Sequence, residues 1–384
     1  MEYYRCENPD CGYIAQEEPD VCPQCGGTFF APLLEEELGG ADWVSLGNQA
    51  VEEERDTDAL ACYQRAAALG DAPGVTNLGW CFEAGVGVAS NPKQAVILYA
   101  QAAADGYYPA LVNLGYCYTY GIGVERDYAK ALECFRKGAE QGLPRAQFLL
   151  GEAYRMGYGV EADMEEAVKW YRSAAWLGAP PAQTELGRCL EFGTGIQKDL
   201  EKAVKWYRAA AEAGHAPGQC CLGYLYESGQ GVEQSWEQAV AWYGKAAEQR
   251  FPRAQCNLGV CCEFGTGTKK DVRRAAELYR AAAEQGDRVA ACNLGYLYES
   301  GVGVEQDWTQ AVQWYTRSAE KGYARGQYNL AWCYEHGKGV ARDRERAAKL
   351  YEQAGEQQYK DARECAAKLR RRRWPFGDGW SFKK

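Results

Sequence analysis

Residues 220–243 read CCLGYLYESGQGVEQSWEQAVAWY, and residues 292–315 read CNLGYLYESGVGVEQDWTQAVQWY. The two stretches start 72 positions apart and are identical at 19 of 24 positions. The stretch between them, 256–279, matches the first at only 8 of 24 positions. We infer that a block of two repeats was duplicated, which a chain tolerates when each repeat contacts only its neighbours.

The single repeat is 36 residues long, because a marker glycine recurs at this spacing. The marker positions are Gly79, Gly115, Gly151, Gly187, Gly223, Gly259 and Gly295, with Ala331 in the eighth place. A G-x-G pair follows each marker, and an aromatic residue closes each repeat at Tyr99, Phe135, Tyr171, Tyr207, Tyr243, Tyr279, Tyr315 and Tyr351. A fixed period of this size predicts a solenoid.

Each repeat is expected to form two helices. Leu222, Leu225 and Tyr226 have helical spacing, and the next glycine, Gly229, suits a left-handed helix end. The second helix is expected to begin at an N-cap, namely Asn91, Asp127, Asp163, Asp199, Ser235, Asp271, Asp307 or Asp343. The marker glycine lies inside the first helix, where it costs about 1 kcal/mol relative to alanine. We therefore expect the partner helix to pack closely against it.

The recurring pattern A-x-x-NLG-x-x-Y-x-x-G-x-GV-x-x-D-x-x-x-A-x-x-WY-x-x-A-A-E-x-G resembles the Sel1-like repeat (SLR), a relative of the tetratricopeptide repeat. The resemblance covers 73–360 as eight repeats, and 42–72 resembles a shortened N-terminal repeat without the G-x-G loop. It implies an all-α, right-handed superhelical solenoid of helix-turn-helix repeats. It also implies a scaffold or adaptor that binds a protein or peptide in its concave groove.

Four cysteines near the N-terminus predict a metal site. Cys6, Cys11, Cys22 and Cys25 follow a C-x4-C and C-x2-C pattern that suits four thiolates around Zn2+. Residues 1–30 resemble a zinc ribbon, and also a rubredoxin-like module, although the first pair is wider than the C-x2-C of rubredoxins. Thirty residues bury little core, so a structural zinc ion would hold this module together. An acidic linker is expected at 31–41.

The other thirteen cysteines follow the repeat phase and are expected to be small core residues. Many unpaired thiols are typical of a reducing compartment. The first residues, MEYYRCENPD, lack the pattern of a signal peptide, and no apolar run reaches the roughly 20 residues that span a bilayer. A cytoplasmic location without a membrane partner is therefore expected.

Two positions of the first helix are candidates for partner binding. Asparagine stands two residues before the marker, and an aromatic residue stands one residue after it, so the two share a helix face. In the related repeats, the resemblance implies, this asparagine holds a peptide. The candidate residues are Asn77, Trp80, Asn113, Tyr116, Tyr224, Asn257, Asn293, Tyr296, Asn329 and Trp332. Glutamates four residues after the marker are expected to bond the loop amides instead.

The sequence gives little support to catalysis. It has only two histidines, His215 and His336, and no visible catalytic constellation. The G-x-G pairs indicate turns rather than phosphate loops. Two alternatives stay open: a redox enzyme with rubredoxin-like iron or a hydrolytic enzyme, and nucleic-acid contact through the ribbon and the arginine-rich tail. The net charge of −10 argues against a general nucleic-acid binder.

Residues 361–384 are expected to form a capping helix and a basic, aromatic tail. Residues 370–384 carry six basic residues and one acidic residue, a charge of +5, which leaves −15 for the remainder. The tail also contains Trp374, Phe376, Trp380 and Phe382. We expect residues 371–384 to dock on the protein's own surface, near the last repeats or on a neighbouring copy.

Overall fold

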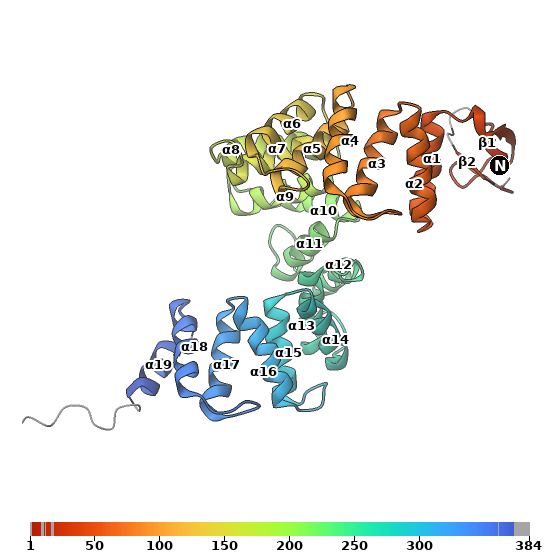
Figure 1. The fold of residues 1–384 in the computed structure, drawn as a ribbon. Helices are drawn as coiled ribbons and strands as arrows, with labels where there is room; N and C mark the ends of the chain where they lie inside the picture. Colours follow the sequence, from red (N-terminus) through yellow and green to blue (C-terminus); the bar gives the residue numbers. More distant parts are fainter. Residues whose placement is uncertain (1, 9–10, 12, 17–18, 360, 372–384) are drawn as a thin grey trace, which may run out of the picture. The chain divides into compact units, whose positions relative to one another are not determined.

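The computed structural model describes residues 2–8, 11, 13–16, 19–359 and 361–371. Within these ranges, side chains are described from residue 3 to residue 370. The chain forms two compact units, each described by itself: residues 1–182 with 193–197, and residues 183–192 with the chain from 198 onward. Figure 1 labels the elements. Most of the predicted tail lies outside the described residues.

The first unit contains β1 (Glu2–Cys6), β2 (Ile14–Ala15), β3 (Phe30–Leu34), the 3-10 helix η1 (Glu35–Glu37), α1 (Gly40–Glu52), α2 (Asp56–Ala68), α3 (Ala72–Ala84), α4 (Pro92–Ala104), α5 (Tyr108–Tyr120), α6 (Tyr128–Glu140), α7 (Pro144–Met156) and α8 (Met164–Trp176). Helix α9 (Pro180–Phe192) is divided between the units. The second unit contains α10 (Leu200–Glu212), α11 (Ala216–Ser228), α12 (Trp236–Glu248), α13 (Pro252–Phe264), α14 (Val272–Glu284), α15 (Arg288–Ser300), α16 (Trp308–Glu320), α17 (Ala324–His336), α18 (Arg344–Glu356) and α19 (Ala362–Arg371).

The 36-residue period corresponds to two 13-residue helices, a seven-residue loop and a three-residue turn, as in 72–107. The predicted all-α solenoid is confirmed. The predicted N-caps are also correct: Asp271, for example, accepts a hydrogen bond from the N–H of Arg274 at 3.0 Å. In the shortened first repeat only residues 53–55 join α1 to α2, so the long G-x-G loop is missing there, as predicted.

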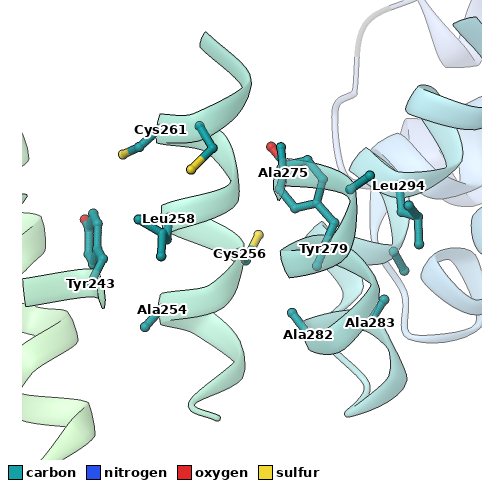
Figure 2. Close-up of a cluster of buried hydrophobic side chains, with 14 of the residues drawn as sticks. Tyr243, Ala254, Cys256, Leu258, Cys261, Ala275, Tyr279, Ala282, Ala283 and Leu294 are labelled. Atoms are coloured by element: carbon teal, nitrogen blue, oxygen red, sulfur yellow. The ribbon is translucent and has the colours of Figure 1, made fainter. Parts of the chain in front are cut away.

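The closing tyrosine of each repeat packs against the marker glycine. Tyr243 is fully buried, and a Cβ added to Gly223 would lie 2.8 Å from its ring. This contact is the expected close approach of the second helix to bare backbone. The tyrosines also join successive repeats into one core, in which Tyr243 and Tyr279 share a buried cluster with Leu258 of α13 (Figure 2).

The second glycine of each G-x-G pair joins a loop to the preceding repeat. Gly267 has a φ of +68°, and a Cβ there would lie 2.3 Å from the carbonyl oxygen of Trp236, at the start of the previous second helix. Glycine is required here for two reasons. Other residues are strained at a positive φ, and their Cβ would clash with this carbonyl oxygen. None of the helices in the described part of the chain combines the length and the hydropathy needed to cross a membrane.

Candidate metal centre and binding surface

The four N-terminal cysteines form one cluster. The sulfurs of Cys6, Cys11, Cys22 and Cys25 all lie within 4.8 Å of one another, and Cys6–Cys25 and Cys11–Cys22 are each 3.5 Å apart. Sulfurs held tetrahedrally at 2.3 Å from zinc lie about 3.8 Å apart. Three of the four thiols are buried. The cluster therefore can hold a metal ion.

Local backbone contacts set this arrangement. Cys6 ends β1, and the N–H of Cys22 donates to the carbonyl of Gly27 at 2.7 Å. The N–H of Gly26 donates a hydrogen bond to the carbonyl of Cys22 at 2.8 Å and closes a tight turn. Gly26 has a φ of +73° in this turn. A hydrogen bond from the backbone of Gly27 lowers the pKa of Cys25 to about 6. Cys25 is thus readily available as the thiolate that binds metal.

The N-terminal cysteine module packs directly on the first repeat, a contact that the sequence did not predict. Strands β2, β1 and β3 form an antiparallel sheet in that order. Its residues Tyr3 and Ile14 are buried in one cluster with Trp43 and Leu46 of α1. The Gln49 side chain donates to the Ile14 carbonyl at 2.9 Å. The module and the first helix pair therefore share one core.

An ion pair reinforces this contact at its edge. Arg5 of β1 lies 2.8 Å from Asp42 of α1, and both side chains are partly exposed. Such a pair contributes at most about 1 kcal/mol because water screens it. Burial of Tyr3 and Ile14 is the larger effect, since a large apolar side chain contributes about 1.5–3 kcal/mol. The hydrophobic contact therefore dominates the docking of the module.

The candidate aromatic residues of the first helices lie at the surface. The exposed fraction is 37% for Trp80, 36% for Tyr224 and 44% for Tyr296, whereas Tyr116 and Trp332 are half-buried. The closing tyrosines, by contrast, are 0–1% exposed in all seven repeats that have one. The closing position on the second helix is thus buried, whereas the candidate position on the first helix is accessible.

The candidate asparagines connect successive repeats. Asn113 accepts a hydrogen bond from Arg145 at 2.8 Å, and Asn293 accepts one from Arg325 at 3.2 Å. The Asn329 amide donates to the Cys292 sulfur at 3.7 Å. Asn257 makes a weaker contact of the same kind, and both it and Asn77 are half-buried. An amide has two donors and two acceptor sites, so one such contact leaves capacity for a peptide.

Sequence reasoning missed apolar residues that extend this surface by one helical turn. Tyr120, Met156 and Phe264 end their helices and are 53%, 46% and 66% exposed. The Tyr120 ring lies 4.5 Å from that of Tyr116, four residues earlier. Four-residue spacing from the chosen aromatic position was the signal that could have identified them. Trp332 continues the pattern, with its ring 4.4 Å from that of His336.

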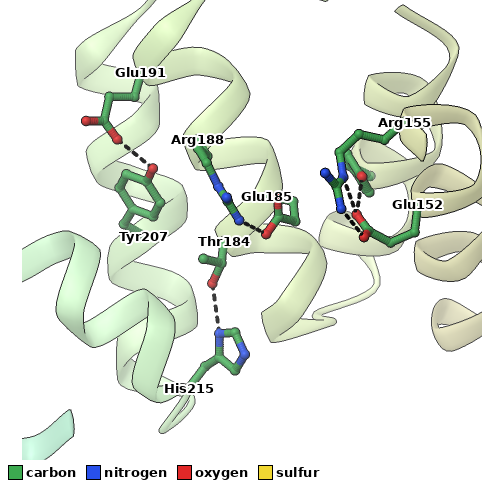
Figure 3. A network of polar contacts seen from close by, with 9 residues as sticks. Glu152, Arg155, Thr184, Glu185, Arg188, Glu191, Tyr207 and His215 are labelled. Carbon is green, nitrogen blue, oxygen red and sulfur yellow. Dashed lines mark hydrogen bonds and ion pairs between the residues drawn. The ribbon is translucent and has the colours of Figure 1, made fainter. Parts of the chain in front are cut away.

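The glutamates after the marker do not bond the loop amides, and that expectation was wrong. Glu191 and Glu227 accept hydrogen bonds from the hydroxyls of Tyr207 and Tyr243 at 2.7 and 2.6 Å (Figure 3 shows the first pair). The long side chain reaches the buried hydroxyl of the partner helix, which would otherwise lack an acceptor. Burial, and after it the hydrogen bond to Glu227, raises the pKa of Tyr243.

The two histidines lie in different repeats and have different partners. His215 forms a hydrogen bond with the Thr184 hydroxyl at 2.8 Å (Figure 3). Burial lowers the pKa of His215. His336 stacks on Trp332 at the exposed end of α17. All seventeen cysteines are free thiols, and fourteen of them are buried.

Comparison with known proteins places these features in context. A scan of family models matched the Sel1 repeat at residues 53–71, 72–107, 109–143, 144–178, 180–215, 216–251, 252–287, 288–323 and 324–359. A protective antigen of uropathogenic Escherichia coli strains with an SLR fold is 36% identical, over 83% of this chain and 68% of that one, with a TM-score of 0.62. A Sel1 repeat protein from Oxalobacter formigenes is 31% identical, over 80% and 89%, with a TM-score of 0.57. A search of curated protein sequences found no match.

Proposed function

Because the chain belongs to the Sel1 repeat family, we propose that it is a scaffold that binds an extended protein or peptide segment along its first helices. The observation that carries this proposal is the accessible aromatic set. Trp80, Tyr224 and Tyr296 stay more than a third exposed, although the fold buries aromatic side chains at other positions of every repeat. Large, rigid aromatic side chains are the residues that dominate binding energy at protein interfaces.

The chemistry of the surface fits an extended segment. Within each compact unit the same helix position presents an aromatic ring at successive or alternate repeats, which suits side chains spaced along a peptide. The neighbouring asparagine amides can donate to and accept from a peptide backbone. We therefore assign apolar side chains of the partner to the rings and its main chain to the half-buried Asn77, Asn113, Asn257 and Asn329, and not to Asn293, which is buried.

For the metal centre we propose a structural zinc ion. Four sulfur donors complete a tetrahedral shell and leave no position for a substrate. The close approach of the sulfurs supports this assignment, because neighbouring thiols lose their protons together only when a cation offsets the charge. Metal analysis of the purified protein tests it: about one zinc per chain is expected, and a red, iron-loaded protein would favour the redox alternative.

Variants of the exposed aromatics test the scaffold role. Partners captured from lysate by the parent protein are identified by mass spectrometry, and one purified partner is then titrated. Tyr296→Ala should weaken its binding by more than about 1 kcal/mol, or roughly fivefold, with an unchanged melting curve. Trp176→Ala is the control, because Trp176 is 74% exposed but lies on a second helix. Equal binding by all three proteins, or a melted Tyr296 variant, would contradict the proposal.

A further inference from the structure

A hollow of about 640 Å³ lies between η1 and the first helix pair. It is lined by Leu34, Glu35, Glu36, Trp43, Ala68 and Leu69, among others. The hollow is separate from the aromatic set of the first helices and from the metal cluster. Its residues all belong to the first compact unit.

The hollow combines apolar walls with an acidic rim. Leu34 and Leu69 are 54% and 59% exposed at its edge. Trp43 forms the floor, and the Arg65 guanidinium lies 4.4 Å from its ring centre while pairing with Glu35 at 2.6 Å. The hollow thus already holds one arginine between an aromatic ring and a carboxylate.

The rim of the hollow is acidic. Glu35 and Glu36 line it, and residues 34–42 contain four acidic residues and no basic residue, a formal charge of −4. Repulsion among such closely spaced carboxylates favours a cationic ligand at this end of the chain. A ligand that fits the hollow should therefore carry both apolar side chains and positive charge.

The chain itself contains a segment of this composition. Residues 372–384, RRWPFGDGWSFKK, carry four basic residues, one acidic residue and four aromatic residues, and they lie outside the described residues. Thirteen residues reach at most about 45 Å when extended. Arginine is the cation that pairs with carboxylates and stacks on aromatic rings, as Arg65 already does here.

We propose that residues 372–384 of one copy dock in the hollow of a second copy. Its aromatic side chains pack against Leu34 and Leu69, and its arginines pair with the acidic rim. The contact joins two different surfaces, so it links copies head to tail and can extend into longer chains. This association is independent of the scaffold role, because it uses none of the proposed partner-binding residues.

The first experiment measures binding of a synthetic, fluorescently labelled peptide of residues 372–384 to the chain ending at Arg371, by anisotropy. Leu69→Asp in the chain should weaken binding at least about tenfold, because it places a charge in an apolar contact. The matched control is Leu177→Asp: Leu69 and Leu177 both cap a second helix and are 59% and 54% exposed. Equal weakening by both variants, or by neither, would overturn the docking site.

A charge exchange tests the arginine contacts. Glu36→Lys should weaken binding of the natural peptide, and a peptide with glutamate at positions 372 and 373 should bind the Glu36→Lys chain better than it binds the parent. Binding of the natural peptide should also weaken as salt rises. Failure of the exchanged pair to recover affinity would contradict a contact between the arginines and this rim.

Sedimentation velocity of the full chain tests the second copy. The average mass should rise with protein concentration, and both the chain ending at Arg371 and the Leu69→Asp full chain should remain monomeric. The Leu177→Asp full chain should associate like the parent. A full chain that stays monomeric at every concentration while the isolated peptide binds would show docking within one copy, and would overturn association between copies.

Discussion

Thr119 and Phe135 depart from the repeat pattern together. Phe135 is the only closing aromatic residue without a hydroxyl, and Thr119 stands where six of the other seven full repeats have glutamate. The Thr119 hydroxyl bonds to its own helix, at the Gly115 carbonyl, 2.9 Å away. In the repeat where Arg155 takes the glutamate position, Glu152 accepts from Tyr171 and pairs with Arg155 (Figure 3). The hydroxyl of the closing tyrosine thus has a carboxylate partner in each of the seven full repeats that have one.

Removing one such hydroxyl should destabilise the fold. Tyr243→Phe leaves the Glu227 carboxylate without its donor, so the free energy of unfolding should fall by about 1–2 kcal/mol. Adding Glu227→Thr, which copies the natural Phe135 and Thr119 pair, should recover part of that loss. Urea denaturation measures both. Tyr224→Phe is the control, since Tyr224 is exposed on the same helix pair, and an equal loss there would contradict the explanation.

Two glycines of one repeat should respond to alanine in opposite directions. Gly223→Ala places a Cβ 2.8 Å from Tyr243 and should destabilise by about 1–3 kcal/mol. Gly244→Ala meets no atom within 4 Å inside α12 and should stabilise by about 0.5–1 kcal/mol. Urea midpoints of the two variants test this. Stabilisation of both variants would show that helix propensity alone decides, and destabilisation of both would contradict the open space around Gly244.

Ala331 shows how the fold accommodates a methyl group at the marker position. Tyr351, its closing tyrosine, stays buried at 1% exposure. Its hydroxyl lies 3.0 Å from Glu335, against 2.5–2.7 Å for the corresponding pairs at Tyr99, Tyr207, Tyr243, Tyr279 and Tyr315. The repeat that carries the extra methyl therefore keeps both the buried ring and its carboxylate partner, at a longer hydrogen-bond distance.

Loss of the metal should affect the first repeat as well as the ribbon. Cys22→Ser should abolish binding of one zinc and raise amide hydrogen exchange in α1, because Tyr3 and Ile14 share a core with Trp43. Exchange in the later repeats should stay unchanged. Cys221→Ser, which removes a half-buried thiol far along the sequence, should keep the metal. Unchanged exchange in α1 after metal loss would show that the docking contributes little.

His215 should make stability depend on pH. Burial lowers its pKa in the folded state, so as pH falls below about 6.5 the unfolded chain binds the proton first. This difference in proton binding has no effect on stability above that pH, and it lowers the free energy of unfolding progressively below it. Urea midpoints at pH 7.5 and 5.5 should therefore differ less for His215→Gln than for the parent. His336→Gln should match the parent, and an identical pH response of all three proteins would contradict the assignment.

Local signals made the helices predictable, whereas contacts across elements were not. Asp271 bonds an amide three residues ahead, so its role follows from sequence alone. The bond from Tyr243 to Glu227 joins two helices, and only the paired change at Thr119 and Phe135 could have indicated it. Packing of Ile14 on α1 links positions with no recurring partner, so no periodicity revealed it.

The ribbon precedes the repeats in the chain, and this order has a consequence for biosynthesis. A nascent polypeptide folds from the end that leaves the ribosome first. The sheet, α1 and α2 can bury Tyr3 and Ile14 in one core before α3 is made. Each later helix pair is then synthesised after its predecessor has folded. Its second loop glycine can pack against the preceding repeat, and its closing ring can pack against its own marker glycine. We therefore expect assembly during translation to proceed in order from the N-terminal module toward the last repeat.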